Sequence, residues 1–268
     1  MTYVVCIPTY KRAKGCNDKT LATLHKHSID PALIYVYVAN QEEYAIYKEI
    51  LSPVLYNSLI VGKEGLVPQR QFISEQWDHG KHIVFFDDDI ESINISLSPR
   101  FKEHTLDSFI TTAFDECENN HAYIWGVYPV WNPFFRSARQ EISTNLSYIV
   151  GAMYAIINRP NLTAIQLKLT EKNGQKEDVE RTLKYFINDS IVIRFNKIGI
   201  KTKYFGKEGG LGKFNDRIQP MKDACQLLEE KYGEYGYTKV RKNGMFEFVL
   251  KKSINNKQKP QKPNPAHF

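Results

Sequence analysis

Three consecutive carboxylates, Asp87, Asp88 and Asp89, form the strongest chemical signal in the sequence, and they follow a short apolar segment at residues 82–86. Adjacent like charges raise one another's pKa unless a cation lies among them. Side chains alternate in an extended chain, so we expect Asp87 and Asp89 on the same side. Two such carboxylates suit a hard divalent ion, Mn²⁺ or Mg²⁺, which can in turn bind a diphosphate. The alternative is a solvated acidic turn in which one aspartate caps a helix.

The turn after the first apolar segment contains Pro8, Thr9 and Tyr10 and ends in two cations, Lys11 and Arg12. Pro8 and Tyr10 offer flat faces for a nucleotide base, while Lys11 or Arg12 can meet a phosphate. An ordinary surface turn with solvated charges is the alternative. We treat this segment as a candidate nucleotide-binding turn.

A glycine-containing segment at residues 62–71 is the third candidate, because Gly65 directly precedes an expected helix. The first turn of a helix presents unpaired amides that attract anions. Arg70 lies one turn inside this helix, where it either faces a bound nucleotide or makes ion pairs on the helix surface.

The elements that position these residues alternate between strand and helix. Apolar strands are expected at residues 2–8, 34–39, 59–61 and 82–86, and helices at about 18–28, 41–51 and 65–77, with Asp18 as the N-cap of the first. This alternation predicts an α/β fold with a mostly parallel sheet and helices on both faces. The polar clusters follow the strand ends, where parallel sheets bind ligands.

The second half of the chain has a different pattern. We expect helices at residues 106–118, 177–186 and 219–232, strands at 123–130, 148–157, 190–195 and 201–205, and a hairpin turning at Asn243 and Gly244. Residues 131–136 form an aromatic loop that could stack on an unpaired base, with Asn132 or Arg136 reading the base edge; core packing is the alternative. The glycine-rich stretch at residues 206–212 is either a flap over a diphosphate or a plain loop.

Composition and charge limit the class of protein. The chain has 268 residues, is 42% hydrophobic and carries a net charge of +6, with eight Lys or Arg and one acidic residue after position 238. A basic end fits a polyanionic partner such as nucleic acid; a solvated tail that aids solubility is the alternative. No apolar run has the length of a membrane span, no leader pattern is present, and the four cysteines lack metal or disulfide spacing. We therefore expect a soluble protein of a reducing compartment, the cytoplasm.

Four motifs in fixed order carry a resemblance to a known family. They are Ile-Pro-Thr-Tyr-Lys-Arg-Ala at residues 7–13, Asn40 with Glu-Glu-Tyr at 42–44, Gly-Leu-Val-Pro-Gln-Arg at 65–70, and Asp-Asp-Asp-Ile at 87–90. Together they resemble the donor half of family-two-like GT-A glycosyltransferases. More narrowly, the chain resembles the TET-associated glycosyltransferases of bacteriophages over residues 2–217, most specifically in the first ninety. The resemblance implies a GT-A domain at residues 1–254, with a donor half at 1–90, an acceptor half at 91–254, and a basic, disordered tail at 255–268.

The resemblance also implies roles for individual residues. Asp89 would be the main metal ligand, with Asp87 beside it near the nucleoside, and the donor-binding set would comprise Pro8, Thr9, Tyr10, Arg12, Asn40, Gly65, Arg70, Asp87 and Asp88. Glu177 and Asp178 resemble the acidic pair that faces the donor, with Asp178 as the first choice for general base and Glu177 as the second. From the residues alone, this pair reads as acids that complement the N-terminus of a helix.

These implications define one expected function and its competitors. We expect transfer of a pentose or hexose from a UDP-sugar, with Mn²⁺ or Mg²⁺, to 5-hydroxymethylcytosine or another 5-hydroxymethylpyrimidine in duplex DNA. The first competitor is the same enzyme class with a polysaccharide, lipid or protein acceptor. A non-enzymatic nucleic-acid-binding protein leaves the three aspartates without a reason. A nucleotidyltransferase would normally begin with a glycine-rich first loop, which is absent. Oligomeric state and stereochemical course stay open.

Overall fold

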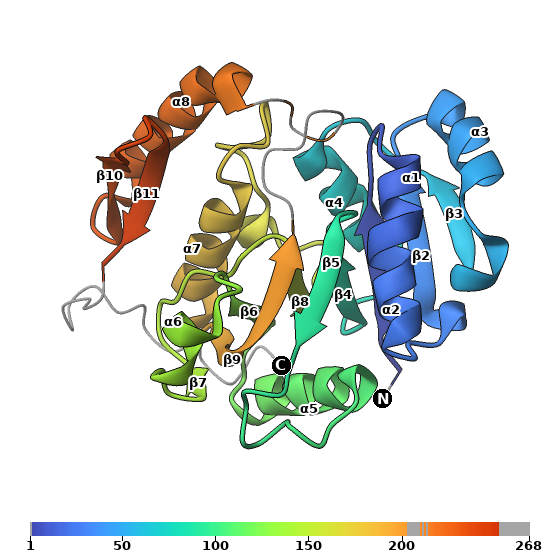
Figure 1. Ribbon diagram of the computed structural model, residues 1–268. Coiled ribbons are helices and arrows are strands. Elements are labelled where there is room, and N and C mark those ends of the chain that lie inside the picture. Colours follow the sequence, from blue (N-terminus) through green and yellow to red (C-terminus); the bar gives the residue numbers. More distant parts are fainter. Residues whose placement is uncertain (1, 203–209, 211, 213, 252–268) are drawn as a thin grey trace.

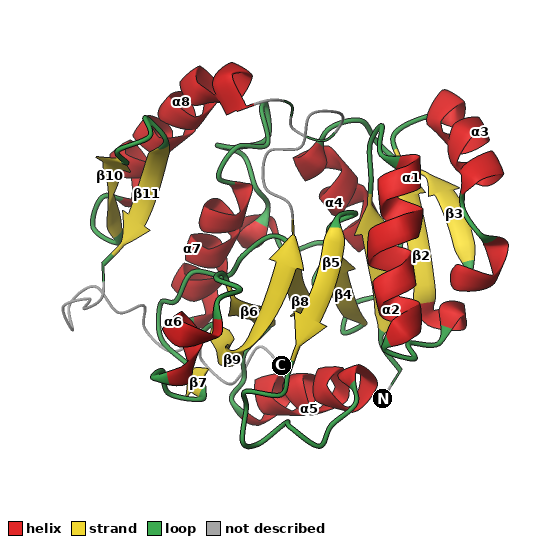
Figure 2. Ribbon diagram, in the orientation of Figure 1, coloured by secondary structure: helices red, strands yellow, loops and turns green. Residues whose placement is uncertain are grey.

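Strands from both halves of the chain join in one sheet in the computed structural model, which describes residues 2–202, 210, 212 and 214–251 (Figures 1 and 2). The described residues form a nine-stranded sheet in the order β3-β2-β1-β4-β8-β6-β9-β5, and β7 also pairs with β9. The strands are β1 (Val4–Pro8), β2 (Ile34–Val38), β3 (Ser58–Val61), β4 (His82–Phe86), β5 (Ile90–Asn94), β6 (Ile124–Tyr128), β7 (Ile142–Ser143), β8 (Met153–Ile157) and β9 (Ile193–Thr202).

The direction of the strands is mostly shared. β3, β2, β1 and β4 are parallel neighbours, β8 runs antiparallel to both β4 and β6, and β9 is parallel to β6. At the edge, β5 returns antiparallel to β9. The predicted α/β fold with a mostly parallel sheet in a single domain is confirmed.

Helices cover both faces of this sheet, as the sequence predicts. The helical segments are α1 (Ala13–Gly15), the π-helical η1 (Cys16–Leu21), α2 (Ala22–Lys26), α3 (Gln41–Ile50), α4 (Leu66–Glu75), α5 (Leu106–Asn119), α6 (Pro133–Ser137), α7 (Glu177–Asp189) and α8 (Phe214–Tyr232), with short 3₁₀ turns η2 (Pro31–Leu33), η3 (Pro53–Leu55) and η4 (Thr163–Ile165). Along β1, Val5 and Ile7 enter one core cluster, whereas Val4 and Cys6 enter another. The first cluster includes Leu24 of α2 and Phe109 of α5, and the second includes Ile73 of α4 and Leu183 of α7.

The first helix begins earlier than the sequence predicts. It runs without a break from Ala13 through η1 and α2, and Asp18 lies inside it, paired with Lys14 at 2.7 Å, instead of capping it. The turn before the helix is held by side chains of α3: the Lys11 amide donates to Glu43 at 2.8 Å, and the Arg12 amide donates to the Tyr47 hydroxyl at 2.9 Å. Long-range partners therefore replace the local cap that we expected.

Three features of the second half also differ from expectation. The strands predicted at residues 190–195 and 201–205 form one strand, β9, up to Thr202, and residues 203–205 lie outside the described part. β5 and β7 were not predicted, since five- and two-residue edge strands carry little periodicity. β8 begins at Met153, because the preceding residues 148–152 form a loop at the site described below.

The C-terminal part of the described chain packs beside the sheet. α8 is followed by the antiparallel hairpin of β10 (Gly236–Val240) and β11 (Phe246–Leu250), on the left in Figure 1. Gly244 has a positive φ of 80° at the turn, as the Asn-Gly pair predicts. The predicted tail at residues 255–268 lies outside the described residues.

Candidate active site

The three aspartates occupy a turn between β4 and β5, which we call the acidic turn (residues 87–89). Thr20 holds this turn at both ends: its hydroxyl donates to the Asp87 carbonyl at 2.7 Å and accepts the Ile90 amide at 2.9 Å. The Asp87 amide donates to the Ala152 carbonyl at 3.0 Å. The turn therefore sets the directions of the three carboxylates. The alternation of side chains along a strand, from which we expected Asp87 and Asp89 on the same side, does not apply.

Two of these carboxylates contact the turn between β1 and α1 (residues 9–12), which we call the first turn. Asp88 is buried; it accepts the Thr9 hydroxyl at 2.6 Å and pairs with Arg12 at 3.2 Å. Arg12 also reaches Asp89 at 3.4 Å, and Asp89 accepts a hydrogen bond from the Thr202 hydroxyl at the end of β9. Burial raises the pKa of Asp88, whereas Arg12 and Thr9 lower it. The first turn and the acidic turn thus form one polar unit.

The third carboxylate, Asp87, faces the opposite wall and pairs with Arg70 at 2.8 Å. Its side chain is 37% exposed, against 7% for Asp88 and 16% for Asp89. Burial raises the pKa of Asp87 to about 7; Arg70 opposes this shift, and the neighbouring carboxylates add to it. The acidic turn thus carries three carboxylates, which pair with two arginines, Arg12 and Arg70.

The acidic turn fits a divalent ion by the chemistry of its donors. Within the described residues, no three His, Cys, Asp or Glu side chains form a complete metal-binding cluster. Asp87 and Asp89 nevertheless supply hard carboxylate oxygens at a turn where three carboxylates pair with two arginines. Mg²⁺ and Mn²⁺ commonly take few protein ligands and complete their coordination with water and substrate phosphate.

The acidic turn and the first turn line a cleft of about 1200 Å³. Of the predicted donor-binding residues, the cleft brings together Pro8, Thr9, Tyr10, Arg12, Gly65, Arg70, Asp87 and Asp88. Asn40 does not line it: its side chain accepts the Glu43 amide at 3.0 Å and caps α3. Lys11 is absent from the lining, and its ammonium lies over the Tyr10 ring at 4.9 Å. Arg12 is therefore the cation of this turn that faces the cleft.

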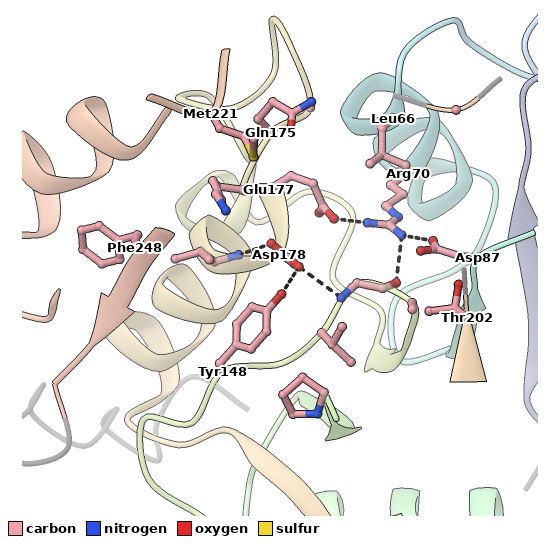
Figure 3. Close-up of a pocket in the computed structure, with 18 of the residues that line it drawn as sticks. Leu66, Arg70, Asp87, Tyr148, Gln175, Glu177, Asp178, Thr202, Met221 and Phe248 are labelled. Carbon is pink, nitrogen blue, oxygen red and sulfur yellow. Dashed lines mark hydrogen bonds and ion pairs between the residues drawn. The ribbon is translucent and has the colours of Figure 1, made fainter. Parts of the chain in front are cut away.

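Glu177 lies at the start of α7, on the side of the cleft that faces the acidic turn, and both of its carboxylate oxygens are bound by arginines (Figure 3). One carboxylate oxygen accepts from Arg70 and the other from Arg181, and the side chain is only 5% exposed. The Arg181 guanidinium lies 3.6 Å from the centre of the Tyr154 ring. Arg70 thus joins Asp87 to Glu177, so α4 connects the acidic turn to α7.

Asp178, the next residue, faces the cleft and is half-buried. One of its oxygens accepts the Tyr148 hydroxyl and the Gly151 amide, the latter at 3.4 Å, and the other accepts the Val179 amide at 2.9 Å. Figure 3 shows Tyr148 and Asp178 directed toward each other. These contacts orient the carboxylate. Of the acidic pair, Asp178 is the member whose oxygens are not held in ion pairs with arginine.

The loop at residues 147–152 was expected to be strand, yet it closes the floor of the site. Gly151 offers its carbonyl to Arg70 at 3.0 Å and its amide to Asp178. A Cβ at Gly151 would come within 2.9 Å of Glu177 and 3.4 Å of Arg70. Only glycine lets the backbone approach both partners this closely.

Sequence reasoning did not bring together the cations that line the rest of the cleft. They are Lys63, Arg139, Lys176, Arg194, Arg217, Arg241 and Lys251, and they come from six segments spread along the chain. Arg217 of α8 donates to the Gln175 side chain at 3.0 and 3.2 Å, near both Asp178 and Arg12. Lys63 lies in the segment at residues 62–71, and Arg241 and Lys251 lie in the basic end, both of which the sequence indicated. The remaining four cations belong to no local motif, so no signal in the sequence could have placed them at the cleft.

Arg136, in the aromatic loop at residues 131–136, differs from its expected role. Arg136 is fully buried, and its guanidinium donates to the Trp131 carbonyl at 2.9 Å and the Lys197 carbonyl at 2.7 Å. Asn132 caps α6 by accepting the Phe134 amide at 3.0 Å. Arg136 is not available to read a base edge, because these carbonyl oxygens already bind its guanidinium, whereas Asn132 is exposed and uses only its side-chain oxygen for the cap. In the glycine-rich stretch, Gly210 donates to the Tyr10 carbonyl at 3.1 Å, and residues 206–209 and 211 lie outside the described residues.

Comparison with known proteins gives distant structural likenesses. No protein-family pattern matches the chain, and no curated protein matches it. Staphylococcus aureus TarS 1-349 in complex with UDP is 16% identical, with a TM-score of 0.49 over 85% of this chain and 66% of that one. The mannosyltransferase PcManGT from Pyrobaculum calidifontis in complex with GDP-Man and Mn²⁺ is 15% identical, with a TM-score of 0.47 over 85% and 63%.

A UDP-glucose pyrophosphorylase complexed with UDP-glucose is also similar, at 10% identity and a TM-score of 0.44, over 86% of this chain and all of that one. The chain spans 42% of full-length TarS. At this distance these structures assign no activity to the chain. In the described part of the chain, no helix has the length and apolar character needed to cross a membrane.

Proposed function

We propose that the protein is a metal-dependent glycosyltransferase of the GT-A type that uses a nucleotide-sugar donor. One observation carries this proposal: the first turn, the acidic turn and the oriented carboxylate of Asp178 line a single cleft at the carboxyl ends of β1 and β4. Ligands of parallel sheets bind at such ends. Three of the four motifs that resemble family-two-like glycosyltransferases, at residues 7–13, 65–70 and 87–90, contribute residues to this cleft.

The donor would lie between the first turn and the acidic turn. Pro8 and Tyr10 would contact the base of a uridine diphosphate sugar, and Arg12 would meet its phosphates. Asp89 and Asp87 would hold Mn²⁺ or Mg²⁺, which neutralises charge on the diphosphate when it is bound. Arg70 keeps Asp87 in place through its second ion pair, with Glu177.

Asp178 would act as the general base of an inverting transfer. Its carboxylate takes the proton of the acceptor hydroxyl, the hydroxyl oxygen bonds to the anomeric carbon of the sugar, and the bond from that carbon to the diphosphate breaks. The diphosphate leaves with the bonding electrons. Arg12 and Arg217 are the cations placed to offset its charge. Glu177, with both oxygens in ion pairs, serves to position Arg70.

The acceptor that we propose is the hydroxyl of a 5-hydroxymethylpyrimidine in duplex DNA, with 5-hydroxymethylcytosine as the first choice. Support comes from the resemblance to the TET-associated glycosyltransferases and from the cations of the cleft. Nine Lys or Arg line it, against seven Asp or Glu, of which three belong to the acidic turn. Positive charge away from the acidic turn suits a phosphate backbone.

A transfer assay tests the proposal. Purified protein is incubated with Mn²⁺ or Mg²⁺, a panel of uridine diphosphate pentoses and hexoses, and DNA with hydroxymethylcytosine, hydroxymethyluracil or neither; nucleosides are then weighed by mass spectrometry. A sugar-sized mass gain that disappears in Asp89→Ala and Asp178→Asn supports the donor site, the base and the acceptor. Metal-dependent hydrolysis of one donor with no gain on any DNA moves the acceptor to a polysaccharide, lipid or protein. No donor turnover at all overturns the enzyme class.

A further inference from the structure

Two neighbouring phenylalanines are exposed on α6. Phe134 and Phe135 are 77% and 52% exposed, and they are the most exposed phenylalanines in the described part of the chain. Their rings meet edge to face at 5.3 Å. Two adjacent exposed rings forgo the stabilisation that burial gives to large apolar side chains. Exposed apolar groups that cluster in this way commonly mark a binding surface.

The backbone that carries these rings is firmly held. Asn132 caps α6, Pro133 occupies the first position of the helix, and Arg136 anchors it from below through three carbonyl and amide oxygens. Gly199 of β9 packs so closely that a Cβ there would lie 2.6 Å from the Arg136 guanidinium. A short exposed helix with a buried arginine beneath it presents its rings in a fixed orientation, as a recognition surface requires.

The helix that carries the two rings lies between two segments of the chain that line the cleft. Pro129 and Val130, before α6, and Arg139, after it, all line the cleft, so α6 forms the part of the rim between them. In Figure 1, α6 lies on the same side of the molecule as the β10–β11 hairpin, which also lines the cleft.

Cations flank α6. The guanidinium groups of Arg139 and Arg194 lie 4.6 and 5.2 Å from the centre of the Tyr128 ring, and the Lys197 ammonium donates to the Ser137 carbonyl. Aromatic rings beside basic side chains are the combination that binds unpaired nucleotides, since rings stack on bases and cations contact phosphates. An uncharged, apolar partner would make no use of the cations.

We propose that Phe134 and Phe135 form a stacking surface for unpaired bases of the DNA acceptor at the rim of the cleft. This inference rests on the proposed function and extends it, because it names a surface that binds the nucleic acid outside the site of sugar transfer. Stacking on a ring is insensitive to base identity, so the surface contributes affinity for opened DNA instead of sequence preference.

Binding measurements with matched variants test the stacking surface. A fluorescent single-stranded oligonucleotide and a duplex with hydroxymethylcytosine are titrated with wild-type protein, Phe134→Ala/Phe135→Ala and Phe134→Leu/Phe135→Leu. Each lost stacking contact weakens single-strand binding by about 5- to 150-fold. The leucine variant is expected to bind as weakly as the alanine variant, because it keeps apolar area but lacks a ring face. Val54→Ala is the control: Val54 is 72% exposed in η3, just before the opposite edge strand β3.

The outcomes separate this inference from the proposed function. Both phenylalanines are exposed, so the variants should unfold at the wild-type temperature. Equal single-strand affinity and equal KM for DNA in wild type and the alanine variant overturn the stacking surface and leave the glycosyltransferase intact. A leucine variant that binds like wild type replaces stacking with general apolar contact and also overturns it. Wild-type protein that neither binds nor glycosylates any DNA removes the proposed acceptor together with this inference.

Discussion

Glu177→Gln tests whether the two ion pairs of Glu177, with Arg70 and with Arg181, support both stability and activity. In the wild type, Glu177 is 4% exposed and neutralises Arg70 and Arg181 together. The substitution leaves Arg70 with Asp87 and the Gly151 carbonyl. The glutamine amide offers one acceptor oxygen in place of two and carries no charge. Arg181 has no second acid, stacks on Tyr154, and already has two buried nitrogens without hydrogen-bond partners in the described residues. The cost therefore falls mainly on Arg181.

Removing one partner of a buried ion pair costs about 3–5 kcal/mol. For a chain of this size, that loss corresponds to a fall of about 6–20 °C in the unfolding midpoint. Activity should fall as well, because Arg70 loses one of the two acids that fix its position against Asp87. Misplacement by an ångström costs on the order of 100-fold in rate.

The matched control is Asp189→Asn. Asp189 is 3% exposed and forms a two-point ion pair with Arg159, at 2.8 and 2.6 Å, outside the cleft. We expect a similar loss of stability from Asp189→Asn, with near wild-type turnover. Urea unfolding followed by tryptophan fluorescence reports stability, and release of UDP from the donor reports activity at a temperature well below both midpoints.

Two results would refute this reasoning. If Glu177→Gln lowered the free energy of unfolding by less than about 1 kcal/mol, its effect would be that of losing an exposed ion pair. Such a result would show that the carboxylate does not neutralise buried charge. Equal loss of turnover in Glu177→Gln and Asp189→Asn would show that activity follows global stability. Complete loss of transfer in Glu177→Gln with an active Asp178→Asn would instead make Glu177 the base.

Three further predictions follow from other contacts. Asp178→Asn should lower kcat by about 10²- to 10⁴-fold, as loss of a general base does, with unchanged affinity for UDP by calorimetry. Thr9→Val removes the 2.6 Å hydrogen bond to the buried Asp88 carboxylate; we expect about 1.5–3 kcal/mol less stability by urea unfolding, the usual worth of a hydrogen bond to a charged group. Burial lowers the pKa of His82 below its ordinary value of 6.5, although Glu118 opposes the shift. The unfolded state then binds more protons than the folded state just below pH 6.5, so stability is lost as the pH falls through this range. His82→Gln should flatten that part of the curve of unfolding midpoint against pH; a curve parallel to that of the wild type would contradict the assignment.

The parallel half of the fold could be read from the sequence because its signals are local. β1, β2, β3 and β4 are apolar segments separated by amphipathic helices, and each was expected within two residues of its observed position. The acidic turn was located for the same reason, since it directly follows a buried strand. Patterns of this kind depend on neighbours in the chain, which any reader of the sequence can see.

The predictions that were wrong, for Asp18 and Arg136, share one physical cause: contacts from residues distant in the chain replaced the local ones that we expected. Asp18 has the side chain of a helix cap, yet α3 supplies the contacts that hold the turn before the helix. Arg136 was expected to face a ligand, but three backbone and amide oxygens from β5, β9 and the loop before α6 satisfy it in the interior. A polar side chain takes whichever partner the fold brings within reach.

The sequence by itself determined the class of fold, the position of the acidic turn and most of the residues that line the candidate donor site, because these depend on local periodicity and on motifs at strand ends. Only the tertiary structure decided which role Glu177 and Asp178 each have. Burial between Arg70 and Arg181 commits Glu177 to ion pairs, whereas Tyr148 and the Gly151 amide orient Asp178 toward the cleft. Two adjacent acids of almost equal chemistry acquire different roles because successive side chains of a helix point in different directions, and only packing determines what each direction meets.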